Sequence, residues 1–165
     1  MGSQLVARFP GGMLSLAFLI HIERIHHSYG AAGLVLAATS VGQAVAGPLT
    51  SRWMRVWGMR KVLLLTLVVC AVAIGTIAFA PTLPVVLYMV LGLIAGLSYP
   101  PIQPAVRTIY PKLVNSTQIT PLYSLDASAQ ELIWIAGPVV ATFVAIQVSP
   151  VTAITVALAF MVVGG

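Results

Sequence analysis

Long apolar runs make up most of this 165-residue chain and alternate with short polar connections. A helix needs about 20 mostly apolar residues to cross a lipid bilayer. Six stretches approach that length, and they cover approximately residues 5–22, 31–49, 62–80, 83–106, 124–148 and 151–165. The pattern therefore predicts an all-α integral membrane protein, a six-helix bundle that forms one domain over residues 1–165.

Composition supports this assignment. Hydrophobic residues make up 59% of the chain and charged residues only 7%, whereas about 25% of the residues in an average soluble domain are charged. So few charges could not cover the surface of a soluble fold of this length, so we expect the lipid bilayer to be the solvent. The net charge is +5, but the bases lie in separate connections rather than in one patch, and we expect no nucleic-acid partner.

The sequence offers little for metal, redox or enzyme chemistry. Cys70 is the single cysteine, which excludes a disulfide within the chain. His21, His26 and His27 do not share a helical face, so we expect no metal site. A serine nucleophile such as Ser98 would need a histidine at the same membrane depth, and none is expected there. We therefore expect no enzyme activity and no cofactor.

The basic residues predict the orientation. If the N-terminus lies in the cytoplasm, that side of the membrane carries seven of the eight bases, leaving only Arg24 outside. The seven are Arg8, Arg52, Arg55, Arg60, Lys61, Arg107 and Lys112. Because cytoplasmic connections are enriched in Lys and Arg, the distribution predicts a multi-pass protein of the cytoplasmic (inner) membrane with a cytoplasmic N-terminus.

Residues 47–63, GPLTSRWMRVWGMRKVL, join the second and third apolar runs and contain half of all bases. We expect Gly47-Pro48 to end one helix and Arg60-Lys61 to open the next. The order resembles the loop between the second and third helices of major facilitator superfamily transporters, G-P-L-x-x-R-x-x-D-R-x-G-R-R-x-x-L. The matching residues are Gly47, Pro48, Leu49, Arg52, Gly58, Arg60 and Leu63, whereas Arg55 replaces the family's acidic residue.

The resemblance implies a fold and a function. The fold is the N-terminal half of a twelve-helix transporter, built as a 3+3 inverted repeat. Its cytoplasmic gating loop contains Gly47, Arg52, Arg55, Gly58, Arg60 and Lys61. The function is secondary active transport of a small molecule, which such proteins bind between two halves. The expected partners are therefore the lipid bilayer, a small-molecule substrate, and either a missing C-terminal half or a second copy of this chain.

The last apolar run reaches Gly165 without a closing charge, and we expect the chain to continue beyond it. The alternative is a truncated or stand-alone six-helix membrane protein without transport activity of its own.

Other segments resemble a group of actinobacterial members of the same superfamily. They are residues 8–13, 28–33, 100–107 and 123–131, the last followed by Gly137-Pro138. Gly137-Pro138 also matches the start of the G-P-x-x-G motif of proton-driven antiporters, although Ala141 replaces its final glycine. This resemblance favours proton-coupled efflux.

A Gly-Pro pair inside a helix also removes a backbone hydrogen bond, so we expect a kink at Gly137-Pro138.

Two carboxyl groups are candidates for proton or substrate coupling, Glu131 and Asp126. Carboxylates within membrane helices are costly and commonly serve proton relays. Glu131 is either such a group or a structural partner for a base such as Arg8 or Arg107. Asp126, nearer the membrane edge, is the more structural of the two. At five residues apart, the two do not share a helical face.

Four further residues are candidates for a substrate pathway: Arg8, Gln43, Arg107 and Trp134. Arg8 precedes Pro10-Gly11-Gly12, a sequence that we expect to bend or unwind the first helix, although Arg8 could equally extend to the membrane interface. Gln43 is isolated among apolar residues, where it either lines a cavity or bonds to a neighbouring helix. Trp134 follows Glu131 by three residues and could share its face.

Overall fold

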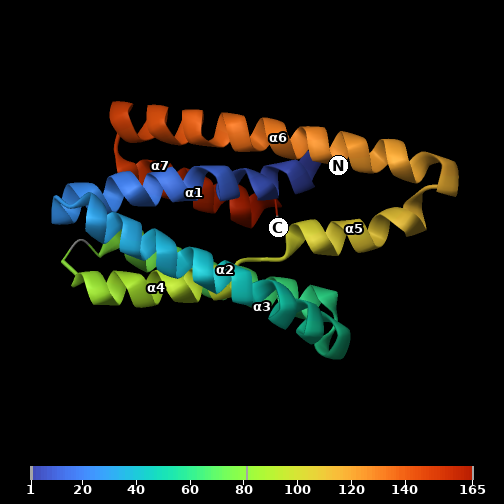
Figure 1. The fold of residues 1–165 in the computed structure, drawn as a ribbon, viewed down its shortest axis with the longest axis horizontal. Helices are drawn as coiled ribbons and strands as arrows, with labels where there is room; N and C mark the ends of the chain where they lie inside the picture. The colour runs from blue at the N-terminus through green and yellow to red at the C-terminus, as the bar shows by residue number, and fades with distance from the viewer. Residues whose placement is uncertain (1, 81, 165) are drawn as a thin grey trace.

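A computed structural model of the protein describes residues 2–80 and 82–164, and it is helical throughout apart from short connections (Figure 1). The described residues form α1 (Gly2–His26), α2 (Tyr29–Trp57), α3 (Met59–Phe79), α4 (Val85–Leu97), α5 (Ile102–Leu113), α6 (Ser116–Gln147) and α7 (Pro150–Gly164). Five segments are long and apolar enough to cross a membrane, with α4 and α5 counted together as Val85–Leu113, and α7 is a shorter apolar helix. The expected all-α membrane bundle is confirmed.

The fourth apolar run differs from the expected continuous helix over 83–106. It contains two helices, α4 and α5, separated by residues 98–101. Pro100 and Pro101 explain the break, because each lacks a backbone N–H and each disfavours helical geometry in the residue before it. The next helix, α6, begins at Ser116 rather than near residue 124. The chain between the fourth and fifth spans is therefore largely helical.

Gly47-Pro48 does not end α2, contrary to the expectation. The helix continues to Trp57, and Gly58, with φ of 85°, makes the turn into α3. Hydroxyl groups support the backbone around Pro48: Thr50 Oγ1 donates to the Ala46 carbonyl at 2.6 Å and Ser51 Oγ to the Gly47 carbonyl at 2.7 Å. Pro48 deprives only the Ala44 carbonyl of its N–H donor, and the helix continues through it. The basic segment is helical on both sides of a single-residue turn, and Arg60 and Lys61 lie in the first turn of α3, as expected.

The packing of the helices has the symmetry of an inverted repeat. The principal contacts join α1 to α6 and α7, α2 to α4, and α3 to α4 and α7. The first three spans are α1, α2 and α3, and the last three are α4 with α5, α6 and α7. If each of the first three is exchanged with its counterpart, the contact of α1 with α6 becomes that of α4 with α2. In the same way, the contact of α1 with α7 becomes that of α4 with α3. This is the arrangement expected of a 3+3 half-transporter.

Glycines bring the two symmetry-related helix pairs together. Between α2 and α4, a Cβ at Gly42 would lie 2.6 Å from the Leu93 carbonyl oxygen. Between α1 and α6, a Cβ at Gly137 would lie 2.9 Å from the Gly12 Cα. In lipid, where apolar burial does not drive helix association, such close backbone approach is a main source of packing energy.

Pro10-Gly11-Gly12 does not bend or unwind the first helix into separate pieces, contrary to the expectation, because α1 is helical from Gly2 to His26.

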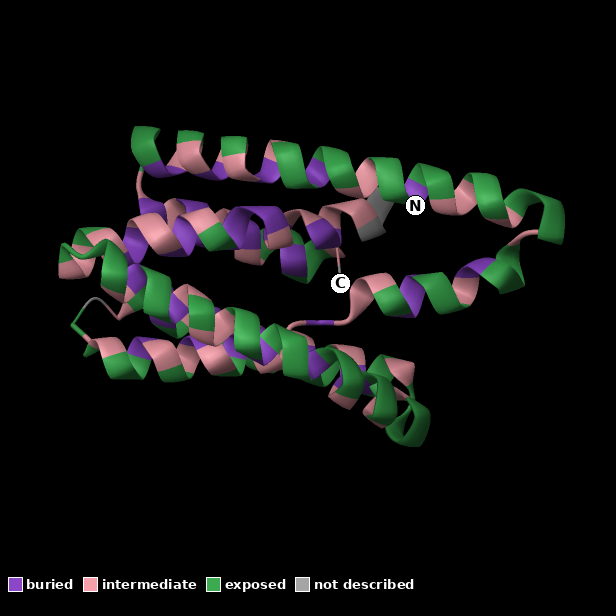
Figure 2. Ribbon diagram, in the orientation of Figure 1, coloured by how far each residue is buried: buried purple, intermediate pink, exposed green. Residues whose placement is uncertain are grey.

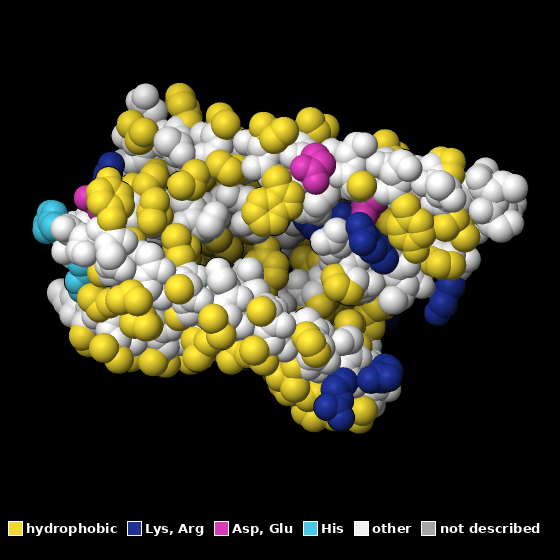
Figure 3. Space-filling view, viewed as in Figure 1, with side chains coloured by type: hydrophobic (Ala, Val, Ile, Leu, Met, Phe, Trp, Pro, Cys, Tyr) yellow, Lys and Arg dark blue, Asp and Glu magenta, His cyan; other side chains and the backbone are white. Residues whose placement is uncertain are grey.

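Exposed side chains fit a membrane environment. Large apolar residues cover the outer faces of the bundle, for example Leu64 and Val68 on α3 and Ile135 and Phe143 on α6, whereas α1 is mostly buried among its neighbours (Figure 2). The Lys and Arg side chains visible in Figure 3 gather mainly at one end of the molecule. The N-terminus, the α2–α3 turn and the α5–α6 turn lie toward that end (Figure 1).

Candidate functional site

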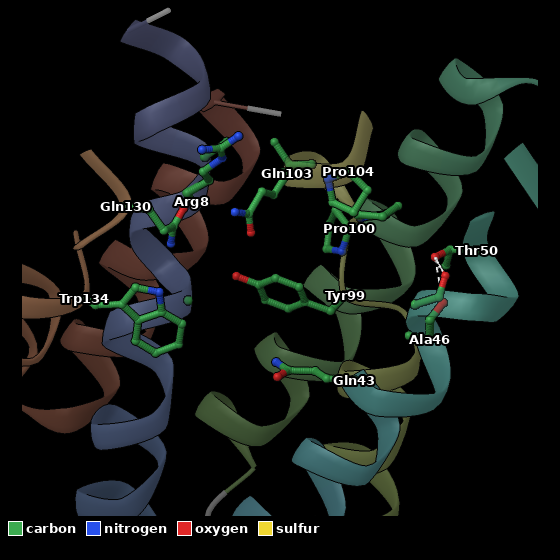
Figure 4. A pocket seen from close by; sticks show the side chains of 15 residues that line it. Arg8, Gln43, Ala46, Thr50, Tyr99, Pro100, Gln103, Pro104, Gln130 and Trp134 are labelled. Carbon is green, nitrogen blue, oxygen red and sulfur yellow. Dashed lines mark hydrogen bonds between the residues drawn. The ribbon is translucent and has the colours of Figure 1, made fainter. Parts of the chain in front are cut away.

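A cavity lies between α1, α2, α6 and the break that separates α4 from α5. Its first lobe has a volume of about 240 Å³ and is lined by polar side chains from every wall. These are Arg8, Gln43, Thr50, Tyr99, Gln103 and Gln130, together with Trp134. In Figure 4, Arg8 and Gln130 lie on one side of the cavity, and Tyr99 and Gln103 point toward them from the other.

A second lobe, also of about 240 Å³, continues the cavity along the bundle. Its lining combines the apolar side chains of Leu14, Phe18, Leu36 and Ile74 with the hydroxyl groups of Ser15, Thr39 and Ser40. The two lobes share Gly11, Gln43, Tyr99 and Trp134, so they adjoin, and the first, which Arg8 lines, is called the polar lobe below. Small-molecule sites in proteins commonly measure about 300–1,000 Å³, so the two lobes together suit a small organic molecule.

A buried ion pair borders the polar lobe. Arg8 Nη1 on α1 donates to Asp126 Oδ1 on α6 at 2.6 Å, and the two side chains are only 4% and 3% exposed. A buried pair of this kind is weak evidence for net stability, because desolvating both charges offsets their attraction. Removing one partner alone is costly, however. The pair therefore constrains how α1 and α6 sit against each other.

Asp126 also contacts α5. The Tyr110 hydroxyl donates to Asp126 Oδ1 at 2.9 Å, and Arg107 Nε lies 3.6 Å from Asp126 Oδ2. One carboxylate thus joins three helices: α1, α5 and α6. With two arginines and one aspartate, the cluster carries a formal net charge of +1 when Asp126 is ionised.

Four buried polar atoms in or beside this cluster have no hydrogen-bond partner among the described residues. They are Arg8 Nε, Arg8 Nη2, Asp126 Oδ2 and Gln130 Oε1, and Arg8 and Gln130 line the polar lobe. Buried polar groups in proteins are almost always paired. These atoms are enclosed by protein, so in this conformation they do not face the open cavity.

The predicted site residues are only partly brought together. Arg8, Gln43 and Trp134 line the cavity, and Asp126 and Arg107 lie in the adjoining cluster. Asp126 is buried rather than open to water at the membrane edge. Glu131 is exposed on α6, and Arg8 and Arg107, its candidate partners, both contact Asp126 instead.

The gating and kink residues lie apart from the cluster. Arg52, Arg55, Arg60 and Lys61 are exposed around the α2–α3 turn, and Gly58 forms that turn. Gly47 borders the polar lobe of the cavity. Gly137 and Pro138 lie within the unbroken α6, where Gly137 contacts α1.

Tyr99, Gln103, Tyr110 and Gln130 were not recognised as site residues from the sequence. For Gln130 a signal existed: Asp126, Gln130 and Trp134 follow one another at four-residue intervals, which places them on one helical face. For Tyr99 the only signal was the adjacent Pro100-Pro101 pair. The described residues contain no group of three His, Cys, Asp or Glu side chains that could hold a metal ion.

Comparison with known proteins gives the family. Neither the curated proteins nor the solved structures include a significant match to this chain. A family model described as Major Facilitator Superfamily matches residues 1–165. That match covers the whole chain, and it agrees with the helical membrane bundle and its inverted-repeat packing. The chain belongs to the Major Facilitator Superfamily of membrane transporters.

Proposed function

We propose that this chain forms the N-terminal half of a proton-coupled secondary transporter that exports a small, partly apolar molecule through the cytoplasmic membrane. The observation that carries the proposal is the contact set of Asp126, a buried carboxylate that joins α1, α5 and α6 beside a cavity. Buried carboxylates in membrane helices commonly serve proton relays.

Asp126 gives protons a way to act on the structure. When it takes up a proton, it loses its charge and its ionic attraction to Arg8 and Arg107. The helices α5 and α6 can then move relative to α1, which opens the basic end of the bundle. Proton binding thereby changes access to the cavity, and this linkage is what coupled transport requires.

The resemblance to known transporters favours export. Its elements are the Gly137-Pro138 pair and the segments similar to actinobacterial members, and the side chains of Leu14, Phe18, Leu36 and Ile74 in the second lobe favour a substrate with an apolar part. The concentration of bases at one end favours a cytoplasmic location for that end. A transporter of this class has its substrate between two halves, so the working unit includes a C-terminal half or a second copy.

The test uses the complete protein encoded at the native locus, expressed in everted bacterial membrane vesicles. Respiration acidifies the vesicle lumen, and a fluorescent amine reports the pH gradient. Ethidium, chloramphenicol and benzoate are added in turn as a cation, a neutral molecule and an anion. We expect at least one of them to dissipate the gradient in wild-type vesicles, beyond its effect on vesicles that lack the protein.

Substitutions then separate the two candidate carboxylates. Asp126→Asn and the charge-neutral double variant R8Q/D126N are expected to abolish the response at matched protein levels, whereas Glu131→Gln retains it. The double variant keeps the test valid if the single variant misfolds. A wild-type protein that dissipates no gradient with any compound, or an R8Q/D126N variant as active as wild type, would overturn the proposal.

A further inference from the structure

The walls of the cavity present no accessible charge. Among the described residues that line the two lobes, Arg8 is the only Lys, Arg, Asp or Glu residue. Its side chain is 4% exposed and pairs with Asp126, which is 3% exposed, so its positive charge is buried and cancelled by that partner. Arg107 and Glu131 line neither lobe. A ligand in the two lobes therefore finds no counter-charge on their walls.

Uncharged hydrogen-bonding groups face the cavity instead. Gln43 is exposed on α2, and it points into the cavity together with Tyr99 and Gln103 (Figure 4). Among the lining residues drawn in Figure 4, hydrogen bonds are marked only at Thr50, so these three polar groups are not paired with one another. A carboxamide has two donors and an acceptor. The walls thus present both donors and acceptors to a ligand.

Two aromatic side chains border the same space. Tyr99, at the break between α4 and α5, and Trp134, on α6, line both lobes and lie opposite each other (Figure 4). The Tyr99 hydroxyl reaches α1, since a Cβ at Gly11 would lie 2.9 Å from it. Aromatic rings pack favourably on the faces and edges of other rings. A planar ring would fit between Tyr99 and Trp134, with its polar substituent toward Gln43, which also lines both lobes.

We propose that the transported molecule is a neutral aromatic compound that carries a carboxamide or a comparable donor–acceptor group. The inference rests on the proposed function, because it names the substrate class for the same cavity. Tyr99 and Trp134 would bind the ring, and Gln43 and Gln103 the polar group. Burying an unpaired ion is far more costly than burying a neutral group that is hydrogen-bonded. These walls therefore disfavour cations and anions alike.

The experiment measures binding to the complete, detergent-purified protein at pH 8 with no proton gradient present. The probes are benzamide, benzoate and benzamidinium, three planar molecules of similar size that are neutral, negative and positive. A ligand that binds the folded state raises its melting temperature. We expect benzamide to do so in a concentration-dependent way, and the two ions to give only a small fraction of its shift. No shift with benzamide up to its solubility limit, or an equal shift with either ion, would overturn the proposal.

A substitution at Gln43 locates the ligand. Gln43→Leu removes a carboxamide from an exposed position, and we expect benzamide affinity to fall about three- to ten-fold, as for the loss of one neutral hydrogen bond. The matched control is Gln147→Leu, because Gln147 is exposed at the last residue of α6 and lines neither lobe. The control should bind like wild type. Equal affinities of the two variants would contradict the assignment.

A change of charge tests the same point in the opposite direction, also where Gln43→Leu does not fold. Gln43→Glu adds a carboxylate to the lining, so we expect this variant to bind benzamidinium more tightly than benzamide. Gln103→Glu, on α5, should do the same. If both variants keep the wild-type order of the three ligands, the ligands do not bind at these walls and the proposal is wrong.

Binding needs no transport, so this assay and the vesicle assay fail independently. Proton-coupled movement of ethidium without benzamide binding would retain the proposed function and reject the substrate class. Benzamide binding that Gln43→Leu weakens, in a protein that dissipates no gradient, would retain the ligand class and reject proton-coupled transport.

Discussion

Gly137 on α6 and Gly12 on α1 lie in backbone contact, so that a Cβ added to Gly137 would come within 2.9 Å of the Gly12 Cα. The contact lies near the cavity, since Gly11 borders both lobes. It therefore sets the spacing of the two helices that carry Arg8 and Asp126. The corresponding contact in the other half of the repeat is that of Gly42 with Leu93 and Gly96.

Gly137→Ala should consequently destabilise the protein. Its methyl group has backbone atoms on the opposing side, which cannot move aside as a flexible side chain could, and overpacking of this kind typically costs about 1–3 kcal/mol. The measurement is thermal unfolding of the complete protein in detergent.

Gly75→Ala on α3 is the matched control, because no atom outside its own helical surroundings lies within 4 Å of the added Cβ. The higher helix propensity of alanine should make this variant equal to or more stable than wild type. Equal stability of the Gly137→Ala and Gly75→Ala variants would show that the α1–α6 contact is looser than described.

The buried ion pair predicts a non-additive response to mutation. Asp126→Asn leaves Arg8 charged and buried beside a neutral partner, which should destabilise the fold by about 3–5 kcal/mol. R8Q/D126N removes both charges and should be more stable than Asp126→Asn alone. Thermal unfolding of the wild-type protein, Arg8→Gln, Asp126→Asn and R8Q/D126N gives the coupling energy between the two side chains. Additive effects would mean that the two side chains do not interact.

The distribution of bases predicts the topology. In a Cys70→Ala background, Ser116→Cys lies at the first residue of α6, next to the α5–α6 connection, and Thr82→Cys lies in the connection between α3 and α4. A membrane-impermeant maleimide added to intact cells should label Thr82→Cys and not Ser116→Cys, and everted vesicles should give the reverse. Labelling of Ser116→Cys from outside the cell would invert the predicted orientation.

Much of the fold could be predicted from the sequence because lipid leaves the backbone few choices. Unpaired backbone groups are too costly in hydrocarbon, so an apolar run of sufficient length becomes a helix. The close contact of Gly42 and Gly96 between α2 and α4 follows the same rule, since small residues let helices approach in lipid.

Proline positions show where sequence reasoning was insufficient. Pro48 was expected to end α2 and does not, while Pro100-Pro101 interrupts the fourth span within the expected helix over 83–106. Two adjacent prolines remove two backbone donors and restrict two preceding residues. A single proline followed by Thr50 and Ser51 removes one donor, and the hydroxyls bind carbonyls next to it. Two adjacent prolines thus separate α4 from α5, whereas Pro10, Pro48 and Pro138 each lie inside a continuous helix.

The site could be predicted only in part. Arg8, Asp126 and Arg107 were recognised as unusual residues in membrane helices, but their pairing was not. Arg8 and Asp126 are 118 positions apart, and their contact depends on how α1 and α6 are rotated and shifted against each other. That register is set by the Gly12–Gly137 contact, and no local pattern in the sequence specifies it.

The central claim is that protonation of Asp126 weakens its contacts with Arg8 on α1 and with Arg107 and Tyr110 on α5, so that α5 moves away from the rest of the bundle. Spin labels at Thr108→Cys on α5 and Ser51→Cys on α2, in a Cys70→Ala background of the complete protein, report that distance by double electron–electron resonance. Both positions are exposed. Asp126→Asn, which has the charge of the protonated acid, and R8Q/D126N should both lengthen the distance relative to the wild-type cluster at neutral pH. A distance in R8Q/D126N equal to that in the wild-type cluster would contradict the account.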